Sequence, residues 1–185
     1  MEQLYTFTVF TENRVGLLSQ ISIIFTRRSV NIESLTVSPS SIPGIHKSTI
    51  TARCTPDMAH KIVSQMEKKI DILKAFFFTD EDIVYQEIAL YKVPTDKLIA
   101  EKDLEKIIRA YNARILEIDK EFTVIEKAGH SDEIESLFYE LRKYDILQYV
   151  RSGRVAVTKI DQELLSNYLE EQEVRRKKTE DGISE

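Results

Sequence analysis

A seven-residue turn near the N-terminus constrains the fold of this 185-residue chain more than any other stretch. The turn, Glu12-Asn13-Arg14-Val15-Gly16-Leu17-Leu18, follows residues 4–10, whose alternation of apolar and polar side chains predicts a half-buried strand. After the turn, apolar residues recur on one face of a predicted helix: Leu17, Ile21, Ile24 and Phe25. The free backbone N–H groups at the start of such a helix suit a small anion, for example an amino-acid carboxylate. Taken alone, however, Asn-x-x-Gly is typical of ordinary turns.

The first 79 residues show the pattern of one βαββαβ unit. The predicted strands and helices follow in that order: strand 4–10, helix 16–28, strand 32–38, strand 46–54, a helix beginning at 55–56, and strand 72–78. Thr55 is a good N-cap, and Pro56 suits the first position of the second helix. Each helix has a single apolar face, so both must lie on the same side of an antiparallel sheet. The sequence therefore predicts an α+β, ferredoxin-like domain.

The last strand of this unit carries more apolar surface than one helical layer can cover. Phe76, Phe77 and Phe78 are consecutive, so their side chains point to both faces of the sheet. An apolar face on a small domain is typical of an interface. Two partners could pack on this face equally well: a second copy of the chain, or the chain's own second half. We prefer a dimer formed through sheet edges or faces.

The second half of the chain repeats this order loosely. The acidic stretch 79–82 predicts a boundary between a domain over residues 1–79 and a second small α+β domain over residues 83–160. The predicted elements are strand 83–93, helix 103–111, a hairpin of 113–118 and 121–127, a helix capped by Ser131, and a final pair of strands, 144–151 and 154–158, around Ser152-Gly153. Residues 161–185, with eight acidic and four basic residues, predict a charged and partly helical tail.

Composition and motifs narrow the function classes. The single cysteine, Cys54, excludes an internal disulfide framework, and the chain lacks a run of 18 apolar residues, so we expect a cytoplasmic protein without a membrane partner. A net charge of −5 does not favour nucleic acid as a partner. The three histidines lack metal-ligand spacing, and phosphate-loop and nucleophile motifs are missing. We therefore expect no metal site and no catalytic residue, and interpret the chain as a binding module.

Several ordered segments resemble one known family, the small subunit of acetolactate synthase, also called the acetohydroxyacid synthase regulatory subunit. Residues 12–19 and 25–37 resemble its ACT domain, and the run Asn-Ile-Glu-Ser-Leu-Thr-Val within them is specific to this family among ACT proteins. Residues 68–74, 87–93 and 150–157 resemble further segments of the family, so the likeness covers about residues 1–160. Gln86 stands where the family commonly has Arg, so a charge contact at that position is not carried over.

The resemblance implies a non-catalytic subunit that binds and activates the catalytic large subunit and confers feedback inhibition by valine. It implies a homodimer formed through the ACT domains, with valine between the protomers. The valine site implied on this chain comprises Asn13, Gly16, Leu17 and Leu18 at the turn, with Asn31 and Ile32 approaching from the partner protomer. No cofactor is expected on this chain, because thiamine diphosphate, FAD and Mg²⁺ belong to the catalytic partner.

Three other functions stay open at this point. The runner-up is an ACT regulator of a different biosynthetic enzyme. A second is an enzyme that acts on amino acids by itself, against which the missing motifs argue. The third is an RNA binder, since the ferredoxin-like fold also hosts RNA recognition motifs and Tyr5, Phe7 and Phe10 lie on the first predicted strand. The chain lacks the basic body and the K/R-G-F/Y run typical of such binders.

Overall fold

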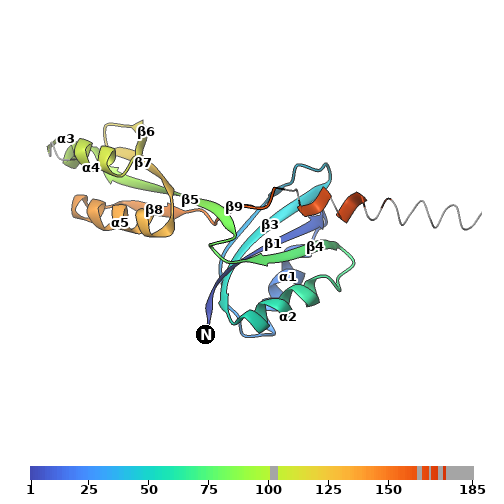
Figure 1. Cartoon of the computed structure of the whole chain (residues 1–185). Helices are drawn as coiled ribbons and strands as arrows, with labels where there is room; N and C mark the ends of the chain where they lie inside the picture. Colours follow the sequence, from blue (N-terminus) through green and yellow to red (C-terminus); the bar gives the residue numbers. More distant parts are fainter. Residues whose placement is uncertain (101–103, 162–163, 167, 171–172, 174–185) are drawn as a thin grey trace, which may run out of the picture. The chain divides into compact units, whose positions relative to one another are not determined.

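The computed structural model of the chain describes residues 1–100, 104–161, 164–166, 168–170 and 173. They form two compact units, one made of Met1–Val84 with the chain from Val157 onward, the other of Tyr85–Ala156 (Figure 1). Much of the predicted 161–185 tail, including the basic run 175–178, lies outside the described residues. No helix in the described part of the chain is long and apolar enough to cross a membrane.

The first unit is a four-stranded antiparallel sheet with two helices on one side (Figure 1). Its elements are β1 (Gln3–Glu12), α1 (Leu17–Thr26), β2 (Ile32–Pro39), β3 (Ile45–Cys54), α2 (Pro56–Met66) and β4 (Ile72–Phe78). The sheet order is β2-β3-β1-β4, as the βαββαβ connection requires when both crossovers lie on one face. The predicted ferredoxin-like fold is therefore confirmed.

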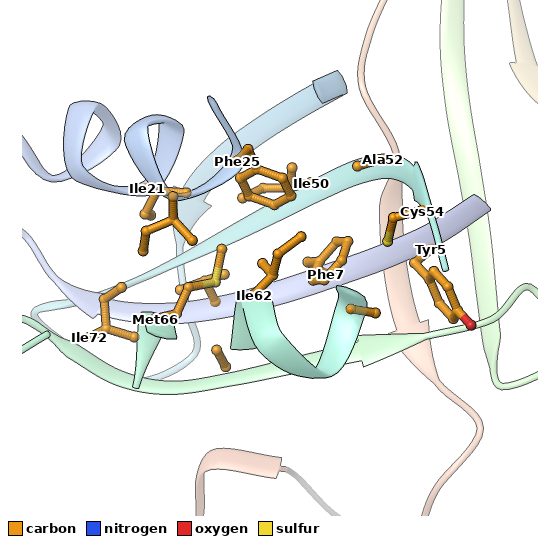
Figure 2. Close-up of a cluster of buried hydrophobic side chains, with 14 of the residues drawn as sticks. Tyr5, Phe7, Ile21, Phe25, Ile50, Ala52, Cys54, Ile62, Met66 and Ile72 are labelled. Carbon is orange, nitrogen blue, oxygen red and sulfur yellow. The ribbon is translucent and has the colours of Figure 1, made fainter. Parts of the chain in front are cut away.

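The core of this unit lies between the sheet and the two helices. Its side chains include Tyr5 and Phe7 of β1, Ile21 and Phe25 of α1, and Ile62 and Met66 of α2 (Figure 2). Val9 and Ile24 belong to the same cluster. Phe7 meets Phe25 edge-on at 5.3 Å between ring centroids. Cys54 is buried in the same core, and this burial raises the pKa of its thiol. Cys54 is thus a small residue of this core.

The three phenylalanines of β4 divide between the two faces of the sheet, as their alternation predicts. Phe77 packs on the helix side against Tyr5, with ring centroids 5.3 Å apart, whereas Phe76 and Phe78 stack together at 6.2 Å. Phe76 belongs to a second apolar cluster with Phe10, and this cluster includes four residues of the C-terminal segment: Leu164, Leu165, Tyr168 and Leu169. We call these four residues the C-terminal strap. The same chain thus covers part of this face, and the predicted dimer stays a prediction.

The second unit repeats the order of the first. Its elements are β5 (Ile83–Pro94), α3 (Thr95–Ala100), α4 (Leu104–Ala110), β6 (Arg114–Ile118), β7 (Phe122–Gly129), α5 (Ser131–Leu141), the 3-10 turn η1 (Arg142–Tyr144), β8 (Gln148–Arg151) and β9 (Val155–Thr158). The sheet order β6-β7-β5-β8 matches that of the first unit strand for strand, and β9 also pairs with β5. Tyr91, Ile125 and Leu137 lie at the centre of its separate core.

Several details of the second unit differ from the predictions. Helix α3 and the turn η1 were not predicted, and β8 begins at Gln148 instead of residue 144. The strands predicted around Ser152-Gly153 do not pair with each other, because β8 and β9 both pair with β5. Ser152 holds the connection on β5, since its N–H donates to the Ile88 carbonyl at 2.8 Å and its hydroxyl accepts from the Ile88 N–H at 2.9 Å. The N-cap of α5 is His130 instead of Ser131, whose hydroxyl donates to buried Glu87 at 2.7 Å.

Candidate functional site

The turn between β1 and α1 begins the helix on a glycine in the left-handed region. Gly16 is the N-cap of α1, with φ +87°, and a Cβ built on it would meet no heavy atom within 4 Å. The backbone angle, and not a lack of space, therefore requires glycine here. Helix α1 has no side-chain cap and no acidic residue in its first turn. Its first N–H groups are consequently left for water or for a ligand.

A cavity of about 330 Å³ opens at this turn. Its walls come from the end of β1, the turn, the first residues of α1, and the facing parts of β2 and β3: Thr11, Glu12, Asn13, Arg14, Val15, Gly16, Leu17, Leu18, Ser19, Val37, His46 and Ser48. The volume falls at the lower end of the range of about 300–1,000 Å³ that holds small molecules. The cavity thus combines an uncapped helix N-terminus with a partly apolar wall.

Four of the six residues predicted for the valine site line this cavity together: Asn13, Gly16, Leu17 and Leu18. The Leu17 side chain is only 6% exposed and belongs to the core, so its backbone is the part offered to the cavity. The Leu18 side chain is 44% exposed. Asn31 and Ile32 are not among the lining residues of this single chain. Their predicted position, on the partner protomer, stays a prediction.

Sequence reasoning missed the wall that the neighbouring strands supply. Antiparallel register places His46 opposite Thr11 and Ser48 opposite Val37. This brings residues from positions 37–48 beside a turn at positions 12–18. No local signal marks these residues, because only the strand pairing decides which of them reach the cavity.

Ion pairs hold the backbone of the turn. The Arg14 guanidinium lies 2.8 Å from the Glu12 carboxylate and 3.0 Å from the Asp71 carboxylate. The Glu12 N–H donates to the Asp71 carbonyl and the Asn13 N–H to the Gly44 carbonyl, each at 3.3 Å. Both Arg14 partners are acidic, so its charge is already matched by the carboxylates of Glu12 and Asp71. An anion in the cavity would therefore rely on backbone N–H groups more than on Arg14.

The cavity has the features of a ligand site more than of a catalytic centre. His46 is its single imidazole, and no cysteine lines it. Among the residues that the structure describes, no three His, Cys, Asp or Glu side chains gather where they could hold a metal ion. The arrangement suits a small zwitterion, because N–H donors, the carboxamide oxygen of Asn13 and apolar side chains meet at one turn.

Each of the two units matches the model of a known protein family. Residues 7–74 match the model of the AHAS small subunit-like ACT domain, and residues 86–160 match that of the small subunit of acetolactate synthase. The acetolactate synthase small subunit of Bacillus subtilis is 30% identical over 168 residues, which cover 90% of this chain and 96% of that protein. This chain belongs to the acetolactate synthase small-subunit family. The probable small subunit of Methanothermobacter thermautotrophicus is 28% identical over 152 residues, with coverage of 82% and 90%.

A solved structure supports the fold of this small-subunit family member. The acetolactate synthase small subunit from Thermotoga maritima aligns with a TM-score of 0.78 and covers 86% of this chain and 99% of its own. At 23% identity, this likeness establishes the fold alone. The turn with Gly16 and its cavity lie within the ACT match over residues 7–74.

Proposed function

We propose that this chain is a non-catalytic regulatory subunit that binds and activates a catalytic large subunit of acetolactate synthase and makes it sensitive to valine. Thiamine diphosphate, FAD and Mg²⁺ belong, in this proposal, to the large subunit. The observation that carries the proposal is the cavity at the uncapped N-terminus of α1, inside a domain that matches the ACT model of this family.

Each part of valine has a complementary group at this cavity. Its carboxylate would accept hydrogen bonds from the free N–H groups near Gly16 and Leu17, where the helix dipole also favours negative charge. Its ammonium would donate to the carboxamide oxygen of Asn13 and to backbone carbonyls. Its branched side chain would contact exposed Leu18 and Val37. Leucine and isoleucine each have one methylene more than valine, and a methylene changes the binding free energy in an apolar pocket by only about 1–3 kcal/mol.

Regulation follows if valine completes a site between two protomers. In the proposed homodimer, Asn31 and Ile32 of the second protomer approach the cavity and contact the ligand. Valine would then favour one ACT–ACT arrangement over another, and the large subunit would respond to that difference. Activation without valine would use another surface of the small subunit.

The match over residues 86–160 favours acetolactate synthase over another ACT-regulated enzyme, because it extends the family likeness beyond the ACT domain. The RNA-binding alternative is not supported, because the three aromatic rings of β1 that could stack on bases are buried. Tyr5 and Phe7 lie in the core between sheet and helices, and Phe10 is buried beneath the C-terminal strap. Bases stack on exposed aromatic rings, which these three residues do not offer.

The test compares Gly16→Asp with Gly16→Asn. The two side chains have nearly the same shape and share the cost of the positive φ, so they differ mainly in charge. Calorimetric titration with valine, and with leucine, isoleucine and threonine for comparison, should show saturable valine binding to the wild type. We expect the aspartate variant to bind valine at least 10-fold more weakly than the asparagine variant, because its carboxylate repels that of the ligand.

Reconstitution with a catalytic large subunit tests the regulatory role. Acetolactate formation should rise when the small subunit is added and fall again with valine, and Asn13→Ala and Gly16→Asp should remove the valine effect but keep the activation. Valine inhibition that survives in both variants would show that the site is elsewhere. A chain that neither activates the large subunit nor binds an amino acid would refute the proposed function.

A further inference from the structure

The sheet face opposite α1 and α2 has its own apolar cluster, and the C-terminal strap is part of it. Leu165 of the strap, Phe10 of β1 and Ile45 of β3 are buried there. Partly buried residues surround these three: Ile42, Leu73, Phe76, Leu164, Tyr168 and Leu169. Leu165 is fully buried although it lies close to the end of the chain. The strap is thus held on this face by a specific contact.

The sequence of the strap is suited to this position. Leu164, Leu165, Tyr168 and Leu169 recur at the spacing of one helical face, and the described residues around them are helical. Glu170 and Glu173 of the same segment are exposed. Among its described residues, the segment therefore turns an apolar face to the sheet and Glu170 and Glu173 to solvent.

The strap contacts residues that lie next to the walls of the cavity. Phe10 of the cluster precedes Thr11 of the cavity wall on β1, and Ile45 of the cluster precedes His46 of the wall on β3. Thr11 and His46 are themselves cross-strand partners. The pairing of β1 with β4 shifts register between Phe10 and Thr11, so the change from cluster to cavity occurs at an irregular point of the sheet.

The loop before β3 joins the same two places. Ile42 belongs to the cluster, and its carbonyl accepts from the Ile45 N–H at 3.2 Å. In the same loop, the Gly44 carbonyl accepts from the N–H of Asn13, which lies in the turn between β1 and α1, at 3.3 Å. Displacing the strap would remove apolar packing from Ile42 and Ile45 and leave the loop held by its hydrogen bonds alone, such as that from the Ser40 N–H to the Ile45 carbonyl at 2.8 Å.

We infer that docking of the C-terminal strap and binding of the amino-acid effector are coupled, so that the docked strap raises the affinity of the cavity for valine. This inference rests on the proposed function, because it requires the cavity to bind valine. The strap holds the ends of β1 and β3 and the loop between β2 and β3 in the form that lines the cavity. Linkage makes the effect reciprocal: bound valine should also stabilise the docked strap.

The test uses the full-length chain with Leu165→Asp, which places a charge in the buried cluster and should release the strap. The matched control is Glu170→Ala, a change at an exposed position of the same segment. Calorimetric titration with valine should give an affinity at least 5-fold weaker for Leu165→Asp and unchanged for Glu170→Ala. Hydrogen exchange should show faster exchange over residues 159–170 and 42–46 in Leu165→Asp, and slower exchange over 159–170 in the wild type when valine is added.

The outcomes separate this inference from the proposed function. If the wild type binds no amino acid, the proposed function fails and the coupling fails with it. If the wild type binds valine and Leu165→Asp binds it equally well with its strap released, the coupling is overturned and the proposed function stands. If Leu165→Asp does not fold by circular dichroism, Leu165→Ala and Leu169→Asp replace it. Their loss of affinity should follow the fraction of strap released, and an affinity independent of that fraction would overturn the coupling.

Discussion

At the scale of single residues, Gly16 links the fold of the turn to the chemistry of the cavity. Its φ of +87° would cost another residue about 1–2 kcal/mol, while the space around it would accept a side chain. The same conformation begins α1 without a side-chain cap and leaves its first N–H groups at the cavity. A polar side chain at this position would compete with a ligand for those donors.

Tyr91 provides a residue-scale prediction about stability and pH. Its buried hydroxyl donates to the Ile134 carbonyl at 2.7 Å and joins β5 to α5. Tyr91→Phe removes this hydrogen bond, while the Ile134 carbonyl keeps its partner within helix α5, so we expect the free energy of unfolding to fall by about 0.5–1.5 kcal/mol at pH 7. Denaturant titration measures the loss. Tyr139→Phe, at an exposed position, should change stability little. Equal stability of the two variants would contradict this reading of the hydrogen bond.

The same residue should also shape stability at alkaline pH. Burial raises the pKa of the Tyr91 hydroxyl above its ordinary value of 10.0, so the folded state favours the protonated form. The resulting stabilisation is complete below pH 10 and is lost as pH rises above it. Wild-type stability should therefore decline above pH 10, and the decline should be smaller in Tyr91→Phe. A part should remain, because burial also raises the pKa of Tyr149.

At the scale of secondary-structure elements, the helix N-termini differ in what satisfies their backbone donors. In α2 the Thr55 hydroxyl accepts from the Met58 N–H at 3.3 Å, and at α5 the Glu133 carboxylate accepts from the His130 N–H at 3.3 Å. Helix α1 has no such side-chain cap. Helices α2 and α5 thus begin with local structural caps, whereas α1 begins at the cavity.

The cap of α2 gives an element-scale prediction. Thr55→Ala removes the hydroxyl that accepts from Met58, and the loss of an N-cap costs about 1 kcal/mol. Thermal or denaturant unfolding should show this loss, while Thr55→Ser, which keeps the hydroxyl, should stay close to the wild type. If serine and alanine destabilise equally, the methyl group of Thr55 contributes the stability instead of the cap.

At the scale of the whole molecule, each of the two units has its own buried core. One is centred on residues such as Ile62 and the other on residues such as Leu137, both fully buried. The matching strand orders show that one topology serves both units. The ligand-type cavity described above belongs to the first unit.

The separate cores give a prediction at the scale of the whole molecule. Ile62→Ala and Leu137→Ala should each cost about 2–5 kcal/mol, because each leaves a cavity in a well-packed core. Hydrogen exchange followed by peptide should show faster exchange mainly in Met1–Val84 for the first variant and in Tyr85–Ala156 for the second. Equal loss of protection in both units from either variant would contradict the assignment of two cores.

Much of the fold could be predicted because local signals agree with it. The alternation along β1, the Thr55-Pro56 start of α2 and the Phe-rich strand β4 each indicate one element with little ambiguity. The predictions are wrong where a residue far away in the chain determines the local structure. Ser152-Gly153 has the composition of a hairpin turn, yet Ile88, 64 residues away, keeps that stretch along β5. His130 replaces Ser131 as the cap of α5 because Glu87 engages the serine hydroxyl.

By itself, then, the sequence determined the βαββαβ order of the first unit, the turn with Gly16, and the family, because these depend on residues close together in the chain. Tertiary structure decided which distant residues meet there. Strand register brings Val37, His46 and Ser48 to the cavity, and helical spacing alone does not tell where the apolar face of the strap docks. The physical reason is that periodicity shows which side of an element is buried, while only packing selects its partner.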